Sequence, residues 1–444
     1  MTGKPTELSV EKLLPGGPGL ARLNGEAILL PEVLPGERVL AEIGQRRGGV
    51  RRGRVLEILS ASPWRVEPDC PHFGHCGGCD FLHVAPRAAL ALKSEAALGD
   101  LAAAWGLSPE LVESPLRTNY RSRAVLHLGP GADGRRAIGF YDRQRSVVDF
   151  AECRLLSPEL MKALPPLKEW AAKAPPGAPE IEINLMMGAD ARGLMIILSP
   201  APARGRDKRS AGRTTEAPDP AGLISNLEKL AVADLAVFWR PSERVQPKRL
   251  SSGGPRRLTA AVWPCWGLTL RSAPGGFSQV NPPVNMAMVE KALALAAPLA
   301  PGPALDLYSG LGNFALPLLK SGFRVTAVEE APEGAAAARE NGRGLSGFRL
   351  IQGRSGEVAA GLAKKGERFK LLLLDPPRAG ARDLAPTLAA LNPERIIYVA
   401  CHPAVLGRDI PAFISLGYRP DRLLALDMFP RTSHLEALVS LARG

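Results

Sequence analysis

Cys401 ends an apolar run and could act as a nucleophile. The run Arg395–Ala400 is typical of a buried strand, and Pro403 stops it. A reactive cysteine needs thiolate character, which a nearby cation, a helix N-terminus or a general base supplies. The helical segment Ala404–Asp409 follows, so its N-terminal dipole is available. Because free cysteine is commonly buried, Cys401 taken alone favours a structural role.

Two acidic residues could complete a reactive site around this cysteine. Asp375 follows the apolar run Lys370–Leu374 and begins the sequence Asp-Pro-Pro-Arg. Glu436 stands early in the otherwise apolar run Leu435–Ala442, where an unpaired carboxylate is costly. Burial would raise the pKa of Glu436, which makes it a candidate general base. His434 is the alternative base, although its position suits a residue that caps or orients the preceding turn.

A glycine-rich turn after a third apolar run could bind a cofactor. The turn Asp306–Phe314, with the sequence DLYSGLGNF, opens a predicted helix. NAD, FAD and S-adenosylmethionine all use such turns, but the missing third glycine of Gly-x-Gly-x-x-Gly disfavours NAD. Glu329 ends the next predicted strand and is suited to hold ribose hydroxyls. We therefore expect S-adenosylmethionine to bind here.

These candidates require a doubly wound α/β sheet to bring them together. In such a sheet, ligands bind in the crevice beyond the carboxyl ends of the strands. From about residue 276 onward, apolar runs alternate with Ala/Leu/Glu-rich helical segments. The last two runs have no helix between them and should form an antiparallel hairpin. The predicted strands are Ala304–Tyr308, Arg324–Glu329, Phe348–Gln352, Lys370–Leu374, Arg395–Ala400, Arg422–Asp427 and Leu435–Ala442.

A second group of cysteines has the spacing of a metal site. Three of them follow the pattern Cys-x5-Cys-x2-Cys, with glycines that let the backbone wrap closely around a bound centre. A fourth cysteine further along the chain would complete four thiolates, which fit either zinc or an iron–sulfur cluster. His72 and His75 are possible zinc ligands in an alternative arrangement. The four candidate cysteines are Cys70, Cys76, Cys79 and Cys153.

The composition favours a polyanionic partner. The chain has 444 residues, 45% of them hydrophobic, and a formal net charge of +12. Nucleic acid is the usual partner of such a basic protein, although a GC-rich genome that prefers Arg and Ala would produce the same charge. The length predicts about two or three domains.

The chain is expected to be cytoplasmic. Six cysteines are too few for a disulfide scaffold at this length. The segment Met1–Val10 is polar and no apolar stretch follows it, so no secretory signal is predicted. No uninterrupted apolar run approaches the roughly 20 residues that cross a bilayer. We expect a reduced, monomeric protein without a membrane partner.

The N-terminal segment reads as a small basic β-barrel. Short alternating runs over residues 5–60 are separated by Pro/Gly turns, as in a closed barrel of the OB type. A cluster of arginines would make it basic, as an RNA-binding face or as a solvated hairpin. The predicted strands are Thr6–Leu13, Glu26–Leu30, Glu37–Ile43 and Gly49–Leu59, and the arginines are Arg46, Arg47, Arg51, Arg52 and Arg54.

The middle of the chain reads as a mixed α/β region. The segment Pro86–Gly106 is Ala/Leu-rich and helical, and could pack against another domain. Two polar, Pro- and Arg-rich stretches, Ala203–Asp219 and Arg240–Arg257, are predicted to be exposed loops. The predicted strands are Arg123–Leu128, Arg135–Tyr141, Glu180–Met187 and Leu194–Leu198.

Taken together, the motifs resemble the S-adenosylmethionine-dependent RNA uracil-5-methyltransferases, including the iron–sulfur enzymes that act on large-subunit ribosomal RNA. Lys4–Ile58 looks like the TRAM domain of that family, an OB-like RNA-binding barrel. Phe277–Asn281 matches its Phe-x-Gln-x-Asn motif, and Asp375–Arg378 its Asp-Pro-Pro-Arg motif. The resemblance covers nearly the whole chain. It implies a barrel over residues 1–62, a central domain with the cysteine cluster over 63–270, and a class I methyltransferase domain over 271–444.

The resemblance also implies roles for individual residues. Cys401 matches the family's nucleophile and Glu436 its base, whereas the four clustered cysteines match the ligands of a [4Fe–4S] cluster. Two departures stand out: His402 where the family usually has Asn, and the stretch Gly353–Glu357, which lacks the acid expected beside the adenine. The implied ligands of S-adenosylmethionine are Gln279, Tyr308, Asn313, Glu329 and Asp375.

The expected reaction is methylation of carbon 5 of a uridine in RNA through a covalent adduct with Cys401. The TRAM-like segment and the cysteine cluster favour ribosomal over transfer RNA. One alternative is an RNA-binding protein with an idle catalytic domain. A cytosine-5-methyltransferase is the rival enzyme, because Pro264-Cys265 is a Pro-Cys pair, but that pair precedes the cofactor turn and lacks its usual Glu-Asn-Val partner.

Overall fold

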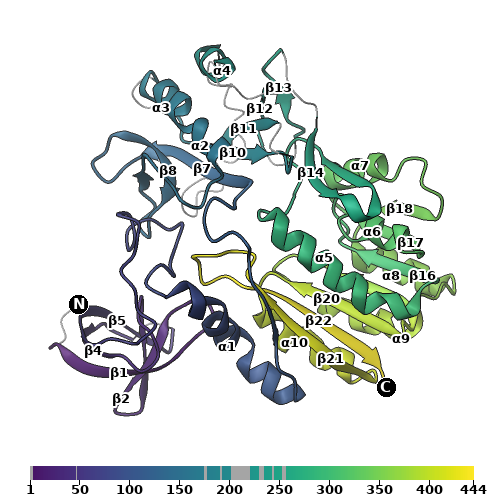
Figure 1. Ribbon diagram of the computed structural model, residues 1–444, viewed down its shortest axis with the longest axis horizontal. Coiled ribbons are helices and arrows are strands. Elements are labelled where there is room, and N and C mark those ends of the chain that lie inside the picture. The colour runs from purple at the N-terminus through teal and green to yellow at the C-terminus, as the bar shows by residue number, and fades with distance from the viewer. Residues whose placement is uncertain are drawn as a thin grey trace.

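The computed structural model describes residues 4–46, 48–174, 178–190, 193–201, 221–229, 235–242, 245–252 and 257–444. These ranges form a closed barrel, a seven-stranded sheet, a two-stranded sheet and an eight-stranded sheet (Figure 1). Arg47 and the predicted loop Ala203–Asp219 lie outside the described residues, and Arg240–Arg257 is described only in part. None of the helices in the described ranges combines the length and apolar character needed to span a bilayer.

The N-terminal barrel closes in the order β1-β2-β3-β5-β4. Alternating apolar side chains such as Leu8, Val10 and Ile28 fill its interior. The prediction missed β2, whose five residues follow a Pro/Gly turn. Several of its arginines are ion-paired on the surface, as in Arg51 with Glu26 at 2.9 Å. The strands are β1 (Thr6–Leu13), β2 (Gly19–Leu23), β3 (Glu26–Leu30), β4 (Arg38–Ile43) and β5 (Arg51–Ser60).

The central sheet has the order β13-β12-β11-β10-β7-β8-β9. Three helices pack against it through a common apolar core. The strands are β7 (Arg123–Pro130), β8 (Arg136–Tyr141), β9 (Val147–Asp149), β10 (Ile181–Met187), β11 (Leu194–Pro200), β12 (Leu235–Trp239) and β13 (Lys248–Arg249), and the helices are α2 (Pro158–Lys162), α3 (Leu164–Ala172) and α4 (Ala221–Glu228).

The C-terminal sheet has the order β18-β17-β16-β19-β20-β22-β21-β6. Its first five strands run parallel, and the predicted antiparallel hairpin is confirmed as β21 and β22. The strands are β6 (Glu110–Val112), β16 (Pro303–Leu307), β17 (Arg324–Glu329), β18 (Phe348–Gln352), β19 (Leu371–Leu374), β20 (Arg395–Ala400), β21 (Tyr418–Leu426) and β22 (Glu436–Arg443).

Helices cover both faces of this sheet (Figure 1). One face packs against α1, α8, α9 and α10, and the other against α5, α6, α7 and the hairpin β14–β15. The elements are α1 (Pro86–Trp105), α5 (Pro282–Ala296), α6 (Ala315–Lys320), α7 (Pro332–Asn341), α8 (Ser355–Lys364), α9 (Ala385–Leu391), α10 (Ala404–Ile414), β14 (Leu258–Trp263) and β15 (Leu268–Ser272).

A segment from the middle of the chain completes this sheet. The predicted helix is α1, and it ends at Gly106, which adopts the left-handed conformation at φ 67°. Leu90 and Leu98 of α1 are buried in the same core as the strands of the C-terminal sheet. The strand β6 then pairs in parallel with β21. The segment therefore lies within the range predicted for the central domain but packs with the C-terminal sheet.

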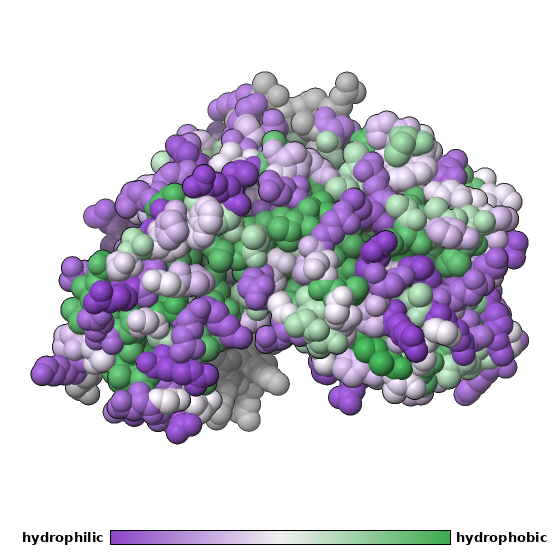
Figure 2. All heavy atoms as spheres, turned by 60° about the horizontal axis from the view of Figure 1, so that its bottom comes forward, coloured by the Kyte–Doolittle hydropathy of each residue, from purple (hydrophilic) through white to green (hydrophobic). Residues whose placement is uncertain are grey.

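The outer surface is polar over much of the face shown in Figure 2, with apolar side chains gathered towards its middle. Among the residues that the structure describes, Phe277 is the most exposed large hydrophobic side chain, at 63%. The guanidinium of Arg123 lies 5.6 Å from the centre of the Phe277 ring. An aromatic ring beside an arginine is a surface on which a nucleobase could stack.

Candidate active site

Five of the predicted site residues lie along one edge of the C-terminal sheet. Leu307 pairs with Val328 on one side and with Leu374 on the other, and Leu374 pairs with Tyr398. The next strand, β22, runs antiparallel, so its first residue stands at the edge where the parallel strands end. In the order of the strands, the residues at this edge are Glu329, Tyr308, Asp375, Cys401 and Glu436.

The strand register brings Cys401 and Glu436 together. Ala400 pairs with Ala437, so the residues just beyond this pair are Cys401 and Glu436. The Glu436 side chain is fully enclosed, with 2% of the residue exposed. Burial raises the pKa of Glu436 well above its usual value, and the charge of Asp375 raises it further. The direction of this shift is the one predicted from the sequence.

Asp375 is the second carboxyl group at this edge. Burial raises its pKa to about 7. Asp375 is half-buried and Glu436 is buried, and two carboxylates that lie close together in such surroundings cannot both ionise cheaply.

The Cys401 thiol is protonated at rest. Its pKa is raised to about 11 by burial and by the charges of Glu436 and Asp375, whereas the charge of Arg378 lowers it. The helix α10 begins at Ala404, close enough for its dipole to act. Burial and the two acids nevertheless outweigh the cationic influences, so the expected thiolate requires deprotonation when substrate binds.

Asp409 is a buried acid near this site that sequence reasoning missed. Its Oδ2 accepts hydrogen bonds from the backbone N–H of Ala381 and from the hydroxyl of Tyr398, both at 2.7 Å. It thereby ties the loop that follows Arg378 to the strand that leads to Cys401. The only sequence signal was an acid on the apolar side of a predicted helix.

The cofactor turn is held by Glu329. Its Oε2 accepts a hydrogen bond from the backbone N–H of Gly310 at 2.8 Å, and its Oε1 accepts one from Ala331 at 2.6 Å. Tyr308 has a positive φ of 64°, which turns the chain sharply at the end of β16. The backbone N–H of Tyr308 donates to Ser355 Oγ at 3.2 Å.

Ser355 belongs to the stretch where an adenine-side acid was expected, and a different carboxylate lies nearby. A Cβ on Gly356 would stand 3.0 Å from a carboxylate oxygen of Asp383, so this acid reaches the start of α8. Burial, together with the charge of Asp383, raises the pKa of Tyr308 to about 12. Asp383 follows in a separate segment, and no motif marked it in the sequence.

The remaining predicted cofactor ligands are Asn313, in the cofactor turn, and Gln279, in the segment before α5. Asn313 exchanges two side-chain hydrogen bonds with Asn285 of α5, each at 2.9 Å. Gln279 is half-buried. Asn281 is fully buried, and its Nδ2 donates to Ser114 Oγ at 3.1 Å and to a backbone carbonyl beyond β21 at 3.3 Å. The Phe-x-Gln-x-Asn segment is therefore anchored at its asparagine.

One pocket brings the four clustered cysteines together. Arg431 lines it as well. Burial, together with the charge of Cys153, raises the pKa of Cys79 to about 12. The backbone N–H of Gly78 donates to the sulfur of Cys76 at 3.4 Å. Across the described ranges, no group of three or more His, Cys, Asp or Glu side chains has the arrangement of a metal site. The cysteines lining the pocket are Cys70, Cys76, Cys79 and Cys153.

Four other residues that the sequence offered as candidates belong neither to the sheet edge around Cys401 nor to the four clustered cysteines. His72 lines the cysteine pocket, whereas His75 is exposed. Cys265 is exposed between β14 and β15, so the Pro-Cys pair lies outside the sheet edge. His434 is exposed, and its ring contacts Phe429 with the centroids 5.9 Å apart. Of the two candidate bases, only Glu436 is buried beside Cys401.

The sequence is similar to a known family and to named bacterial enzymes. Residues 267–444 match the family described as tRNA (Uracil-5-)-methyltransferase. The 23S rRNA (uracil(1939)-C(5))-methyltransferase RlmD of Alkalilimnicola ehrlichii is 34% identical, over 99% of this chain and 97% of its own. The enzyme of the same name from Pseudomonas putida is 33% identical, over 100% of this chain and 94% of its own.

A solved structure shares the fold. The tRNA (uracil-54, C5)-methyltransferase of Pyrococcus abyssi, in complex with S-adenosyl-L-homocysteine, superposes with a TM-score of 0.72 at 24% identity. The match covers 98% of this chain and 100% of that one. The full-length similarity to the bacterial enzymes, together with this fold, shows that the chain belongs to the family of RNA uracil-5-methyltransferases.

Proposed function

We propose that this protein transfers a methyl group from S-adenosylmethionine to carbon 5 of a specific uridine in large-subunit ribosomal RNA. The observation that carries this proposal is the sheet edge, where Cys401 and Glu436 face each other beside Asp375 and the cofactor turn. The bacterial relatives that match the whole chain are named as 23S rRNA enzymes, which supports ribosomal RNA as the substrate.

Cys401 is the proposed nucleophile. Carbon 5 of uracil is a poor nucleophile, and addition of the Cys401 thiolate to carbon 6 generates an enolate that makes carbon 5 reactive. Arg378 favours the thiolate, because its charge lowers the pKa of Cys401. Bound S-adenosylmethionine supplies an electrophilic methyl group for carbon 5. The target base must leave its stack to reach this buried edge.

Glu436 is the proposed base. After methyl transfer, its carboxylate removes the proton from carbon 5, and the electrons of that C–H bond expel Cys401 by β-elimination. Glu436→Gln should therefore form the methylated adduct and release it slowly, so that a covalent RNA–protein complex accumulates on denaturing gels. Normal release by this variant would refute the assignment of Glu436. Glu394→Gln, on the turn before β20, is a matched control that should release RNA normally.

The proposed cofactor site uses the residues around the turn. Glu329 would hold the ribose, exchanging its hydrogen bond with Gly310 for the ligand. Glu329→Gln should weaken binding of S-adenosylhomocysteine in calorimetry, whereas Glu330→Gln on the same turn should not. The proposed ligands of S-adenosylmethionine are Gln279, Tyr308, Asn313, Glu329 and Asp375.

Mapping of 5-methyluridine in a deletion strain tests the target. Loss of one modified uridine from large-subunit ribosomal RNA, with transfer RNA unchanged, supports the proposal, and loss from transfer RNA alone supports the alternative substrate. Incorporation of labelled methyl into uridine- rather than cytidine-containing RNA separates the rival cytosine chemistry. No incorporation at all would favour an RNA-binding protein with an idle catalytic domain.

The four cysteines are proposed to hold a [4Fe–4S] cluster with a structural role. Four thiols lining one pocket supply the donors of such a cluster, although the same donors also suit zinc. Residues 64–83, which carry Cys70, Cys76 and Cys79, are called the cysteine segment here. When bound, the cluster would tie this segment to Cys153 in the central domain. Anaerobically purified protein should show the broad visible absorption of an iron–sulfur centre with matching iron and sulfide. Stoichiometric zinc without iron would exclude the cluster.

A further inference from the structure

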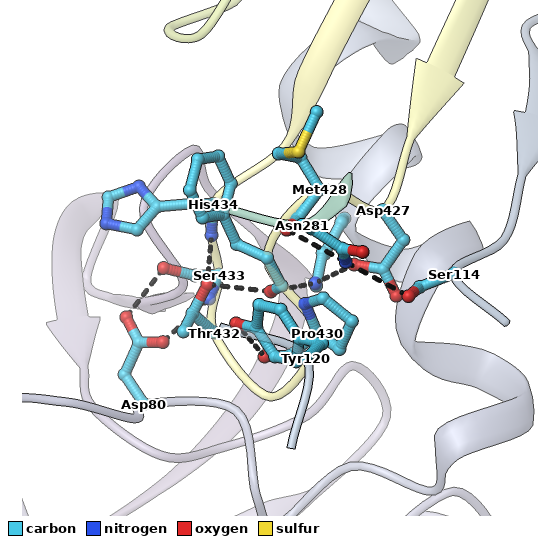
Figure 3. A network of polar contacts seen from close by, with 12 residues as sticks. Asp80, Ser114, Tyr120, Asn281, Asp427, Met428, Pro430, Thr432, Ser433 and His434 are labelled. Atoms are coloured by element: carbon cyan, nitrogen blue, oxygen red, sulfur yellow. Dashed lines mark hydrogen bonds and ion pairs between the residues drawn. The ribbon is translucent and has the colours of Figure 1, made fainter. Parts of the chain in front are cut away.

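The loop of residues 427–435 leads directly into Glu436 (Figure 3). It joins β21 to β22, and side chains from three distant parts of the chain bind it. Because the ends of a loop this short are fixed by strands, contacts to its middle decide how its last residues enter β22. The contacts are Lys93 Nζ to Asp427 Oδ1 at 2.7 Å, Asn281 Nδ2 to the Met428 carbonyl at 3.3 Å, and the Tyr120 hydroxyl to the Pro430 carbonyl at 3.0 Å.

The cysteine segment holds the end of the loop that lies nearest to Glu436. Asp80 accepts two hydrogen bonds from Ser433, one from its backbone N–H to Oδ1 and one from its hydroxyl to Oδ2, both at 2.6 Å. The backbone N–H of Phe81 donates to the carbonyl of Arg431 at 3.2 Å. Such a two-point contact to a carboxylate fixes both position and orientation.

The N-terminal barrel reaches the same point. Gly17, in the turn between β1 and β2, has a positive φ of 95°, and a Cβ added there would lie 2.9 Å from the Cβ of Ser433. Its position leaves no room for a side chain, so the barrel turn packs directly on Ser433. The barrel, the cysteine segment and the catalytic sheet therefore meet at one residue.

We propose that Asp80 is a positioning residue for the reaction: by holding Ser433 it sets the place of Glu436 opposite Cys401. This inference rests on the proposed function. Only His434 and Leu435 separate Ser433 from Glu436, and Leu435 is buried. A shift of Ser433 therefore passes to the carboxylate, and a proton transfer is sensitive to displacements of about 1 Å. The cysteine segment thus acts on the removal of the carbon-5 proton.

Single-turnover kinetics can isolate this step. Holoenzyme, RNA and labelled S-adenosylmethionine are mixed and quenched, and the methylated adduct and released RNA are separated on denaturing gels. In Asp80→Ala we expect adduct to form at the wild-type rate and to resolve roughly ten-fold more slowly. Asp80→Asn should restore resolution, because its amide can still accept from the Ser433 N–H and donate to the hydroxyl.

Two further variants keep the test independent of the cysteine site. Ser433→Ala lies outside that site and removes one of the two hydrogen bonds, so it should slow the same step by a smaller factor. Glu228→Ala removes an exposed carboxylate at the end of α4, outside the cysteine pocket and the loop, and should leave both steps unchanged. Iron content and circular dichroism are measured for each protein.

The outcomes are distinct. Slow resolution in Asp80→Ala and Ser433→Ala, at unchanged iron content and with rescue by Asp80→Asn, supports the proposal. Resolution at the wild-type rate in Ser433→Ala and Asp80→Ala would overturn it while leaving the proposed function intact. Equal slowing of adduct formation and resolution would also overturn it, because it indicates general damage. A wild-type enzyme that transfers no methyl group would overturn the proposed function itself.

Discussion

Cys401 and Cys79, the latter in the pocket of four cysteines, are both half-buried, but they differ in the charges around them. At Cys401 the neighbouring groups are acids, which raise the pKa of the thiol to about 11 together with burial. At Cys79, burial and the charge of Cys153 raise the pKa to about 12, but Arg431 and Arg121 act against this shift. Both thiols have arginine near them, but the charges that add to the effect of burial come from carboxylates at Cys401 and from other cysteines at Cys79.

This difference has a chemical consequence. A thiol of high pKa is largely protonated and inert at neutral pH, but its thiolate is the stronger nucleophile once formed. As the proposed nucleophile, Cys401 would be protected at rest and reactive once substrate binding helps to remove its proton. The clustered thiols, beside two guanidinium groups, can be held as thiolates by a metal. Four substitutions test this contrast.

Removal of the reactive thiol should have the largest effect. Cys401→Ala should lose the covalent adduct and lower methyl transfer by roughly a thousand-fold or more, because no other group at the sheet edge can add to carbon 6. Its iron content should equal that of the wild type. Cys265→Ala, which alters an exposed thiol, is the matched control and should keep full activity. Full methyl transfer by Cys401→Ala would refute the covalent scheme.

A substitution in the cysteine pocket should change metal content first and activity second. Cys79→Ser removes one thiolate from the pocket, so most of the bound iron should be lost and the melting temperature should fall. Adduct should still form with whatever folded protein remains, since Cys401 is intact. The measurements are iron analysis, thermal unfolding and gel detection of the adduct. Wild-type iron content in this variant would contradict the proposed ligand set.

Arg378→Gln should raise the pKa of Cys401 further, because Arg378 lowers it in the wild type. The thiolate fraction then falls at every pH below that pKa. Adduct formation, which should rise with pH towards about 11 in the wild type, should be slower by roughly ten-fold for each unit of added shift. Arg382→Gln, on the same loop and exposed, is the control. An unchanged pH profile in Arg378→Gln would remove Arg378 from the mechanism.

The smallest effect concerns stability. The pKa of Asp375 is raised to about 7 in the folded protein, so the folded state binds a proton more tightly than the unfolded chain. This favours folding at low pH and is lost as the pH rises through about 7. Asp375→Asn removes the penalty, so its melting temperature should exceed that of the wild type by a few degrees at pH 8 and by less at pH 5. A constant difference between the two pH values would contradict the assigned shift.

Much of the fold could be predicted because its strands are continuous apolar runs between clear breaks. The bounds of Arg324–Glu329 and Arg395–Ala400 agree with the structure residue for residue. Two of the strands that were missed, β2 and β6, lack this signal, whereas β12 and β14 are apolar runs that were missed as well. β2 is five residues long with an arginine inside it, and β6 has three residues, two of them exposed. β6 forms a strand because it pairs with β21, and not because of its own residues.

The residues of the site likewise fall into those that the sequence could identify and those that it could not. Cys401 and Glu436 could be identified because a polar residue at the end of an apolar strand is unusual in itself. Asp80 and Asp409 could not, because what they do depends on residues distant in the sequence or in the fold. Asp80 binds Ser433 across 353 positions of the chain. Asp409 is recognisable only once the loop after Arg378 is seen to fold back onto it.

The pairing of β6 with β21 limits how this enzyme can be divided. A fragment that starts at residue 271 would lack both α1 and β6, and would expose the long edge strand β21 together with the apolar face that Leu90 and Leu98 cover. An unpaired, apolar strand edge is a template for intermolecular β-sheet formation. The fragment is therefore expected to aggregate, whereas one that starts at Pro86 would carry its own edge protection. The chain must also keep β6 unpaired during synthesis until β21 emerges from the ribosome.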